Sequence, residues 1–137
     1  MVHAEIEIIN MEDLVSAKKN LIDQDEIRRM RIRVLVDTGS YFFCINENIQ
    51  SYLNLPFIEK KRLRTADDRV IEYDVVGPVE VRFQDKKTHC SAFVLPGDSA
   101  PLLGSVPMEQ LDVIVHPLRQ ELHVNTEIHL LPTLKLV

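Results

Sequence analysis

The sequence contains few residues of several kinds, and each shortage excludes a class of protein. Cysteine occurs only at Cys44 and Cys90, without a Cys-x-x-Cys pair, which indicates a reduced compartment and not a disulfide framework. We expect each thiol to be a small buried apolar group. No apolar run approaches the roughly 18 residues that a membrane-spanning helix requires, so no membrane partner is expected. The first residues lack a basic start followed by an apolar stretch, so we predict no secretory signal and a cytoplasmic protein.

The composition also gives little reason to expect a metal site or nucleic-acid binding. The five histidines show no zinc-ligand spacing with cysteines or acids, so we expect neither a metal nor another cofactor. A net charge of -5 gives no general electrostatic reason for nucleic-acid binding. The local basic cluster of Lys60, Lys61, Arg62 and Arg64 is predicted to be a solvated face.

The residues that are present predict one mainly β domain. A chain of 137 residues, 45% hydrophobic and 27% charged, can bury one core but has no room for two sizeable ones. Short β-forming runs between turn residues predict strands over 3–9, 30–36, 41–45, 61–65, 70–76, 79–83, 88–95, 112–115 and 120–124. Helices are expected over 11–19 and 47–53, capped by Asn10 and Asn46, with one or two helical turns over 106–111.

Two of the four glycines lie in motifs that carry chemistry. Because glycine permits close backbone approach, scarce glycines mark backbone positions under special demand. Gly39 belongs to Asp37-Thr38-Gly39-Ser40, which directly follows the strand ending Val34-Leu35-Val36. Gly104 ends Leu102-Leu103-Gly104, about 65 residues after Asp37. Between the two motifs lies a predicted hairpin over 63–73 with the polar tip Ala66, Asp67, Asp68 and Arg69.

In this order the motifs resemble those of the retropepsin-like aspartic proteases, the single-motif relatives of pepsin. The sequence around these motifs is more similar to that of the small free-standing cellular members than to a viral polyprotein segment. The resemblance covers about residues 30–124 and implies a closed β-barrel of the retropepsin type with one or two short helices. The remaining segments, 1–29 and 125–137, are then an N-terminal extension and a C-terminal tail of the single domain 1–137.

The resemblance implies peptide hydrolysis by a pair of aspartates. Two carboxyl groups that share one proton can act as base and acid, because like charges so close cannot both ionise. The chain has a single Asp-Thr-Gly and no room for a second lobe. A working pair therefore requires Asp37 from two copies across a twofold axis, so the expected partners are a second copy and a peptide or protein substrate.

The resemblance also assigns roles around Asp37. Thr38 is expected to reach across the dimer interface, Gly39 to bring its N–H to the carboxylates, and the Ser40 hydroxyl to donate to Asp37. Leu102, Leu103 and Gly104 are expected to pack beneath this loop as structural residues.

Residues 66–69 are the expected flap tip over the substrate. Asp67 and Asp68 replace the glycine common there in the family, and they would favour basic substrate residues. A solvated turn without substrate contact is the alternative.

Other functions remain compatible with the sequence. A catalytically silent member of the same fold would serve as a dimerisation or peptide-binding module. In an unrelated β-barrel, Asp37 would only start a turn. The apolar tail would either add strands to a dimer or pack on its own subunit.

Overall fold

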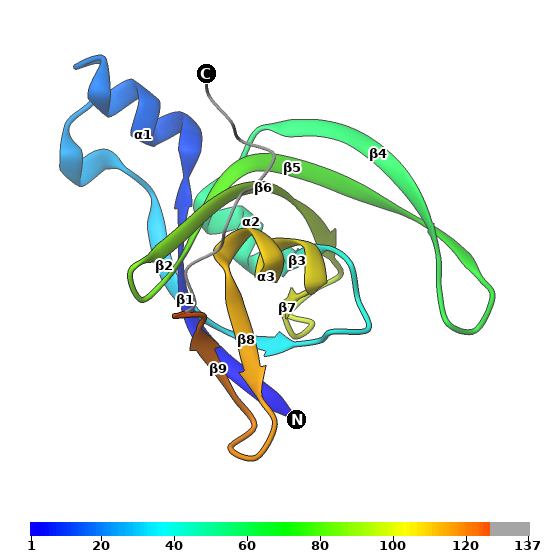
Figure 1. Cartoon of the computed structure of the whole chain (residues 1–137). Helices are drawn as coiled ribbons and strands as arrows, with labels where there is room; N and C mark the ends of the chain where they lie inside the picture. Colours follow the sequence, from blue (N-terminus) through cyan, green and yellow to red (C-terminus); the bar gives the residue numbers. More distant parts are fainter. Residues whose placement is uncertain (127–137) are drawn as a thin grey trace, which may run out of the picture.

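The computed structural model describes residues 1–126 and is mainly β, as predicted (Figure 1). The strands are β1 (Val2–Asn10), β2 (Arg29–Val36), β3 (Phe43–Asn46), β4 (Phe57–Arg64), β5 (Val70–Phe83), β6 (Lys86–Leu95), β7 (Leu102–Leu103), β8 (Val113–His116) and β9 (Glu121–Val124). The helices are α1 (Met11–Lys18), the 3-10 turn η1 (Gln24–Glu26), α2 (Glu47–Leu53) and α3 (Ser105–Leu111). Within residues 1–126 no helix is both long and apolar enough to cross a bilayer. The apolar tail over 128–137 lies outside the described residues.

Seven strands form a ring-like sheet. Their order is β1-β2-β7-β3-β6-β5-β4, and β1 also pairs with β5. This second pairing joins β5 back to the start of the order, so β4 alone extends outside the ring (Figure 1). Strands β8 and β9 form a separate two-stranded sheet. The β4–β5 hairpin projects beyond the other strands on the right of the view.

Alternation along β2 places its apolar side chains inside the ring. Ile32, Val34 and Val36 are buried, and Arg31 and Arg33 are exposed, as the period of two predicts. Burial of this apolar face is the main stabilising contribution of the strand, because each fully buried side chain of this size contributes about 1.5–3 kcal/mol.

The N-terminal segment is an integral part of this sheet. Strand β1 pairs antiparallel with β2 from Val2 opposite Val36 to Ile9 opposite Arg29. Ile6 and Ile8 are buried in the same core as the β2 side chains. The sheet therefore includes part of the 1–29 segment that we set apart as an extension, because these residues close the ring.

Both predicted asparagine caps are present. Asn10 Oδ1 accepts from the Asp13 N–H at 3.1 Å, and Asn46 Oδ1 accepts from the Ile49 N–H at 2.8 Å. Asn10 is fully buried and donates to the Leu53 carbonyl at 2.9 Å, so one side chain connects α1 with α2. Helices α2 and α3 are the two expected in the core region, and α1 precedes it.

The predicted break between 70–76 and 79–83 is absent. Strand β5 runs through Gly77 and Pro78, and its register against β6 shifts between Val76 and Val79. Proline cannot donate to a regular ladder, which is why the sequence predicts an interruption there. An irregularity of the β-bulge kind accommodates the proline without ending the strand.

A buried carboxylate connects β5 and β6 on the outside of the ring. The Glu80 side chain is 4% exposed, and its two oxygens contact Arg82 Nε at 2.6 Å and His89 Nε2 at 2.8 Å. Burial raises the pKa of Glu80, but hydrogen bonds from His89 and Arg82 outweigh burial and lower that pKa below its ordinary value of 4.5. The ionised form is therefore the one that the fold stabilises.

We expect Glu80→Gln to lower the free energy of unfolding by about 1–2 kcal/mol at pH 7, because the charged hydrogen bonds to Arg82 and His89 are lost. The loss stays this small because both partners are partly exposed to solvent. A depressed carboxyl pKa contributes stability above the unfolded pKa, and this contribution is lost as pH falls through the folded pKa. Urea unfolding between pH 7 and pH 3 should therefore show the two proteins converging below about 4.5. Glu109→Gln, at an exposed position of α3, is the control. A difference that does not change with pH would contradict this role.

Candidate functional site

Asp37 lies directly at the end of β2, where β7 fixes the backbone. Strands β2 and β7 are parallel, with Val36 opposite Leu103. The Asp37 N–H donates to the Leu103 carbonyl at 3.0 Å, and the Leu35 N–H donates to the Pro101 carbonyl at 2.9 Å. The second motif thus extends the ladder up to the acidic residue itself.

A tight turn then presents the carboxylate at the surface. The Ser40 N–H donates to the Asp37 carbonyl at 3.1 Å, and the Gly39 N–H donates to Asp37 Oδ1 at 3.0 Å. A Cβ on Gly39 would lie 3.3 Å from Oδ1, so glycine gives this approach room. Asp37 is half-buried, and Thr38 and Gly39 are exposed. The carboxylate therefore has a fixed orientation and an accessible second oxygen.

The segment after Gly104 holds the other half of this loop through three backbone hydrogen bonds. The N–H groups of Gly104, Ser105 and Val106 donate to the carbonyls of residues 42, 40 and 41 at 3.1, 2.7 and 3.0 Å. A Cβ on Gly104 would lie 2.6–2.7 Å from backbone atoms of Ser40 and Phe42. Only glycine permits this contact.

The two leucines of the second motif lie in different parts of the core. Leu103 is fully buried in the main core of the ring. Leu102 packs in a smaller cluster with Phe42 and Phe93, whose ring centroids are 4.8 Å apart. The structure thus brings residues 37–40 and 102–104 together. The two leucines are structural support and not reacting groups.

The Ser40 hydroxyl does not donate to Asp37 within the described chain. Ser40 instead supports the turn through its backbone, which donates to Asp37 and accepts from Ser105. The Thr38 side chain, which is exposed, makes no hydrogen bond with another residue of 1–126. The expected reach of Thr38 across a dimer interface stays a prediction.

The polar hairpin tip is a tightly paired turn. Asp68 has a φ of 64°, which places it in the left-handed region where Asp is tolerated better than most residues. Its carboxylate contacts Arg64 Nη1 at 2.7 Å, and the Asp67 carboxylate contacts Arg69 Nε at 2.7 Å. A hydrogen bond from Thr65, and also that from Arg69, lowers the pKa of Asp67. Arginines of the same turn therefore compensate both acids, which weakens the expected attraction for basic substrate residues.

The hairpin tip and the Asp37 loop are separate in this chain. Among residues 1–126, no hydrogen bond or ion pair links residues 66–69 to residues 37–40. The tip belongs to the projecting end of the β4–β5 hairpin (Figure 1). Any role over a substrate therefore requires the hairpin to close or a second chain to be present.

Neither cysteine has the environment of a nucleophile. Burial raises the pKa of Cys44 to about 11 and that of Cys90 to about 12. Both are free thiols, and the thiolate is the reactive form. Cys44 is buried, as predicted, whereas Cys90 is only partly buried.

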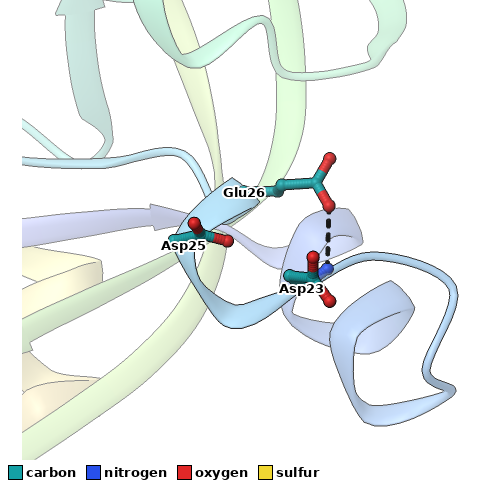
Figure 2. Close-up of side chains that lie close together, drawn as sticks. All are labelled: Asp23, Asp25 and Glu26. Carbon is teal, nitrogen blue, oxygen red and sulfur yellow. Dashed lines mark hydrogen bonds between the residues drawn. The ribbon is translucent and has the colours of Figure 1, made fainter.

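Figure 2 shows three exposed acidic side chains, Asp23, Asp25 and Glu26, whose carboxylate oxygens lie within 4.8 Å of one another. Asp25 and Glu26 belong to η1, and Asp23 is its N-cap residue. The Asp23 N–H donates to Glu26 Oε1 at 2.9 Å, which satisfies a free donor at the start of the turn. Capping accounts for this arrangement.

A groove next to the Asp37 loop was not predicted from the sequence. It has a volume of about 390 Å³ and is lined by residues of β3, β4, β5, β6 and α3, so we call it the β4–α3 groove. Phe42 and Val106, which flank the loop contacts described above, form part of its wall. Its lining residues come from five separate segments between residues 42 and 110, so no local sequence pattern predicts it.

Comparisons with known proteins provide no relative: no protein-family model matches the chain, and no curated protein matches its sequence significantly. Function must therefore be inferred from the residues themselves.

We expect Gly104→Ala to lower the free energy of unfolding by about 3 kcal/mol, because its Cβ meets backbone atoms that cannot move independently. Gly97→Ala is the matched control, since a Cβ there meets nothing within 4 Å. Its φ of 57° should cost only about 1 kcal/mol. Urea unfolding measures both. Equal losses at the two positions would contradict the close contact at Gly104.

Proposed function

We propose that the chain is an aspartic endopeptidase that acts as a homodimer, with the Asp37 carboxylates of two copies activating water. The observation that carries this proposal is the Asp37 turn, which is fixed by hydrogen bonds to the Leu102-Leu103-Gly104 motif. The ring-like sheet with a projecting hairpin supports a closed barrel of the retropepsin type. We retain the cytoplasmic location as part of the proposal, because both cysteines are free thiols.

In the proposed mechanism the two carboxyl groups share one proton. The ionised Asp37 takes a proton from water while the water oxygen attacks the peptide carbonyl carbon. The protonated Asp37 of the second copy gives its proton to the carbonyl oxygen, which yields a neutral gem-diol. Collapse of the diol breaks the C–N bond: one diol hydroxyl gives its proton to the ionised carboxylate, and the protonated carboxyl gives its proton to the leaving nitrogen, so the pair again holds one proton. Acid and base labels then belong to the pair and not to either copy.

The backbone around Asp37 suits this chemistry because it leaves little freedom to the carboxylate. The Gly39 N–H binds one oxygen at 3.0 Å, and the turn is closed by the Ser40 N–H. A donor fixed before the reaction costs no reorganisation during it. The second oxygen is left for water or for the other carboxyl.

Several surfaces suit a dimer. Thr38 and Gly39 are exposed at the tip of the turn, where a twofold axis would pass. The β8–β9 hairpin exposes Ile114 and Leu118, which are 51% and 90% accessible. Asp37 does not line the β4–α3 groove. This is expected if the substrate cleft over the carboxylates exists only between two copies.

A catalytically silent module of the same fold is the second candidate. The observation that favours it is the hairpin tip, where two acid–arginine pairs stand in place of the glycine common in the family. A flap must move to admit substrate and exclude water. The intact Asp37-Thr38-Gly39 turn favours the enzyme, since a binding module has no need of an oriented carboxylate.

Asp37→Asn should abolish cleavage, because the amide cannot share a proton with the second carboxyl. We expect a loss of about 10²- to 10⁴-fold in the cleavage rate of a peptide library, and pepstatin should inhibit the unchanged protein. Asp85→Asn, at an exposed turn position, should leave the rate unchanged. An undiminished cleavage rate in Asp37→Asn would contradict the proposal, and folded unchanged protein without any cleavage favours the silent module.

The dimer is tested by sedimentation velocity over a range of protein concentrations. Ile114→Glu should raise the dimer dissociation constant by about tenfold or more, because a buried apolar contact would be replaced by a charge. Leu21→Glu, at a 71% exposed position near α1, is the control. Specific activity should fall in parallel with the dimer fraction. A strictly monomeric protein with full activity would contradict the shared site.

A further inference from the structure

The β4–α3 groove has the size and lining of a binding site. Its volume of about 390 Å³ lies within the range of about 300–1,000 Å³ that is usual for ligand pockets. Its walls are largely apolar and include Phe42, Phe43, Ile58, Val75, Phe93 and Val106. Ile58 and Val106 are 47% and 42% exposed, although both are large apolar side chains. An apolar hollow with exposed rims indicates a place for an apolar side chain from elsewhere.

The groove lies next to the segment that follows the Asp37 turn. Phe42 follows Ser40 by two residues, and its ring packs on Phe93 inside the groove wall. On the other wall, the Val106 N–H donates to the Tyr41 carbonyl at 3.0 Å. The groove wall and the loop are therefore one packed unit.

Two charges of β4 line the groove without a partner from the fold. Glu59 and Lys61 are two residues apart and so face the same side of the strand. Neither forms an ion pair with another residue of the described 1–126. Lys60 faces the other side, where it contacts Asp74 Oδ1 at 3.1 Å. The fold thus pairs the charge of Lys60, whereas Glu59 and Lys61 are exposed and available to a ligand.

We propose that the β4–α3 groove binds an extended peptide, with an apolar side chain in the hollow and one basic and one acidic residue, two positions apart, facing Glu59 and Lys61. An extended chain presents side chains on one side at every second residue, which matches the spacing of these two charges. Opposite charges across neighbouring strands attract, and like charges repel.

The free edge of β4 favours an extended ligand over a compact one. Strand β4 ends the strand order, and β5 is its one strand neighbour among residues 1–126. Its outer N–H and C=O groups can therefore pair with an added strand. The bound segment would be a flanking part of the peptide substrate; this last step rests on the proposed function, whereas binding itself does not.

The test measures binding without cleavage, on the full chain carrying Asp37→Asn. Short fluorescein-labelled peptides contain a leucine and a Lys-x-Glu pair, and matched peptides carry Glu-x-Lys, Gln-x-Gln or asparagine in place of leucine. Fluorescence anisotropy should show one charge order binding about two- to fivefold tighter than Gln-x-Gln. Replacing the leucine should weaken binding by about tenfold or more.

Variants of the groove locate the site. Ile58→Glu should weaken binding by about tenfold or more, whereas Leu21→Glu, at an exposed position outside the groove, should not. Exchange of the two charges, Glu59→Lys with Lys61→Glu, should reverse the preferred charge order of the peptide. That reversal distinguishes a contact with these residues from a general loss of structure.

Three results would overturn the proposal. Equal affinities of the Ile58→Glu and Leu21→Glu proteins would place binding elsewhere. An unchanged charge preference after the exchange would show that Glu59 and Lys61 do not contact the peptide. Binding that appears only after removal of residues 127–137, or only on dilution of the protein, would assign the groove to the chain's own tail or to a second copy. Intact peptide binding in a protein that shows no cleavage would contradict the proposed protease function but not the proposed peptide binding in the β4–α3 groove.

Discussion

The backbone contact between residues 40–42 and 104–106 is the constraint on which the candidate site depends. Three N–H groups on one segment meet three carbonyls on the other at 2.7–3.1 Å, and this is possible because Gly104 has no Cβ. Such a contact fixes the backbone positions of both segments, since backbone groups cannot change rotamer to relieve a clash. The Asp37 turn, the position of Phe42 and the start of α3 all follow from it. The carboxylate and the groove are thus consequences of one junction.

Features governed by local rules were predictable from the sequence. The alternation of Ile32, Val34 and Val36 identified the buried face of β2, and Asn10 and Asn46 identified two helix starts, because strand period and capping involve neighbours in the chain. The proximity of Asp37 and Gly104 was predicted by resemblance, since no local pattern connects residues that far apart. The structure supplied the hydrogen bonds between them.

Features that depend on distant partners were missed. The closing role of β1 requires β5, about 70 residues later, so Ile6 and Ile8 were counted as belonging to an extension. The acids of the hairpin tip were read as free charges because their arginine partners depend on the turn geometry that the chain adopts. Lys61 was predicted only to be part of a solvated basic face, and Glu59 was given no role, because the sequence does not show which side chains of β4 find an ion-pair partner.

The closure of the ring by β1 also orders the events of synthesis. Strand β1 is followed by β2 within some 30 residues, but the part of β5 that pairs with β1, residues 79–82, is synthesised much later. The junction around Gly104 comes later still. Asp37 is therefore synthesised well before the segment that completes its loop, and such long-range closure is slow compared with local pairing. A nascent chain that stops before residue 106 contains the acidic residue but not the structure that would give it a function.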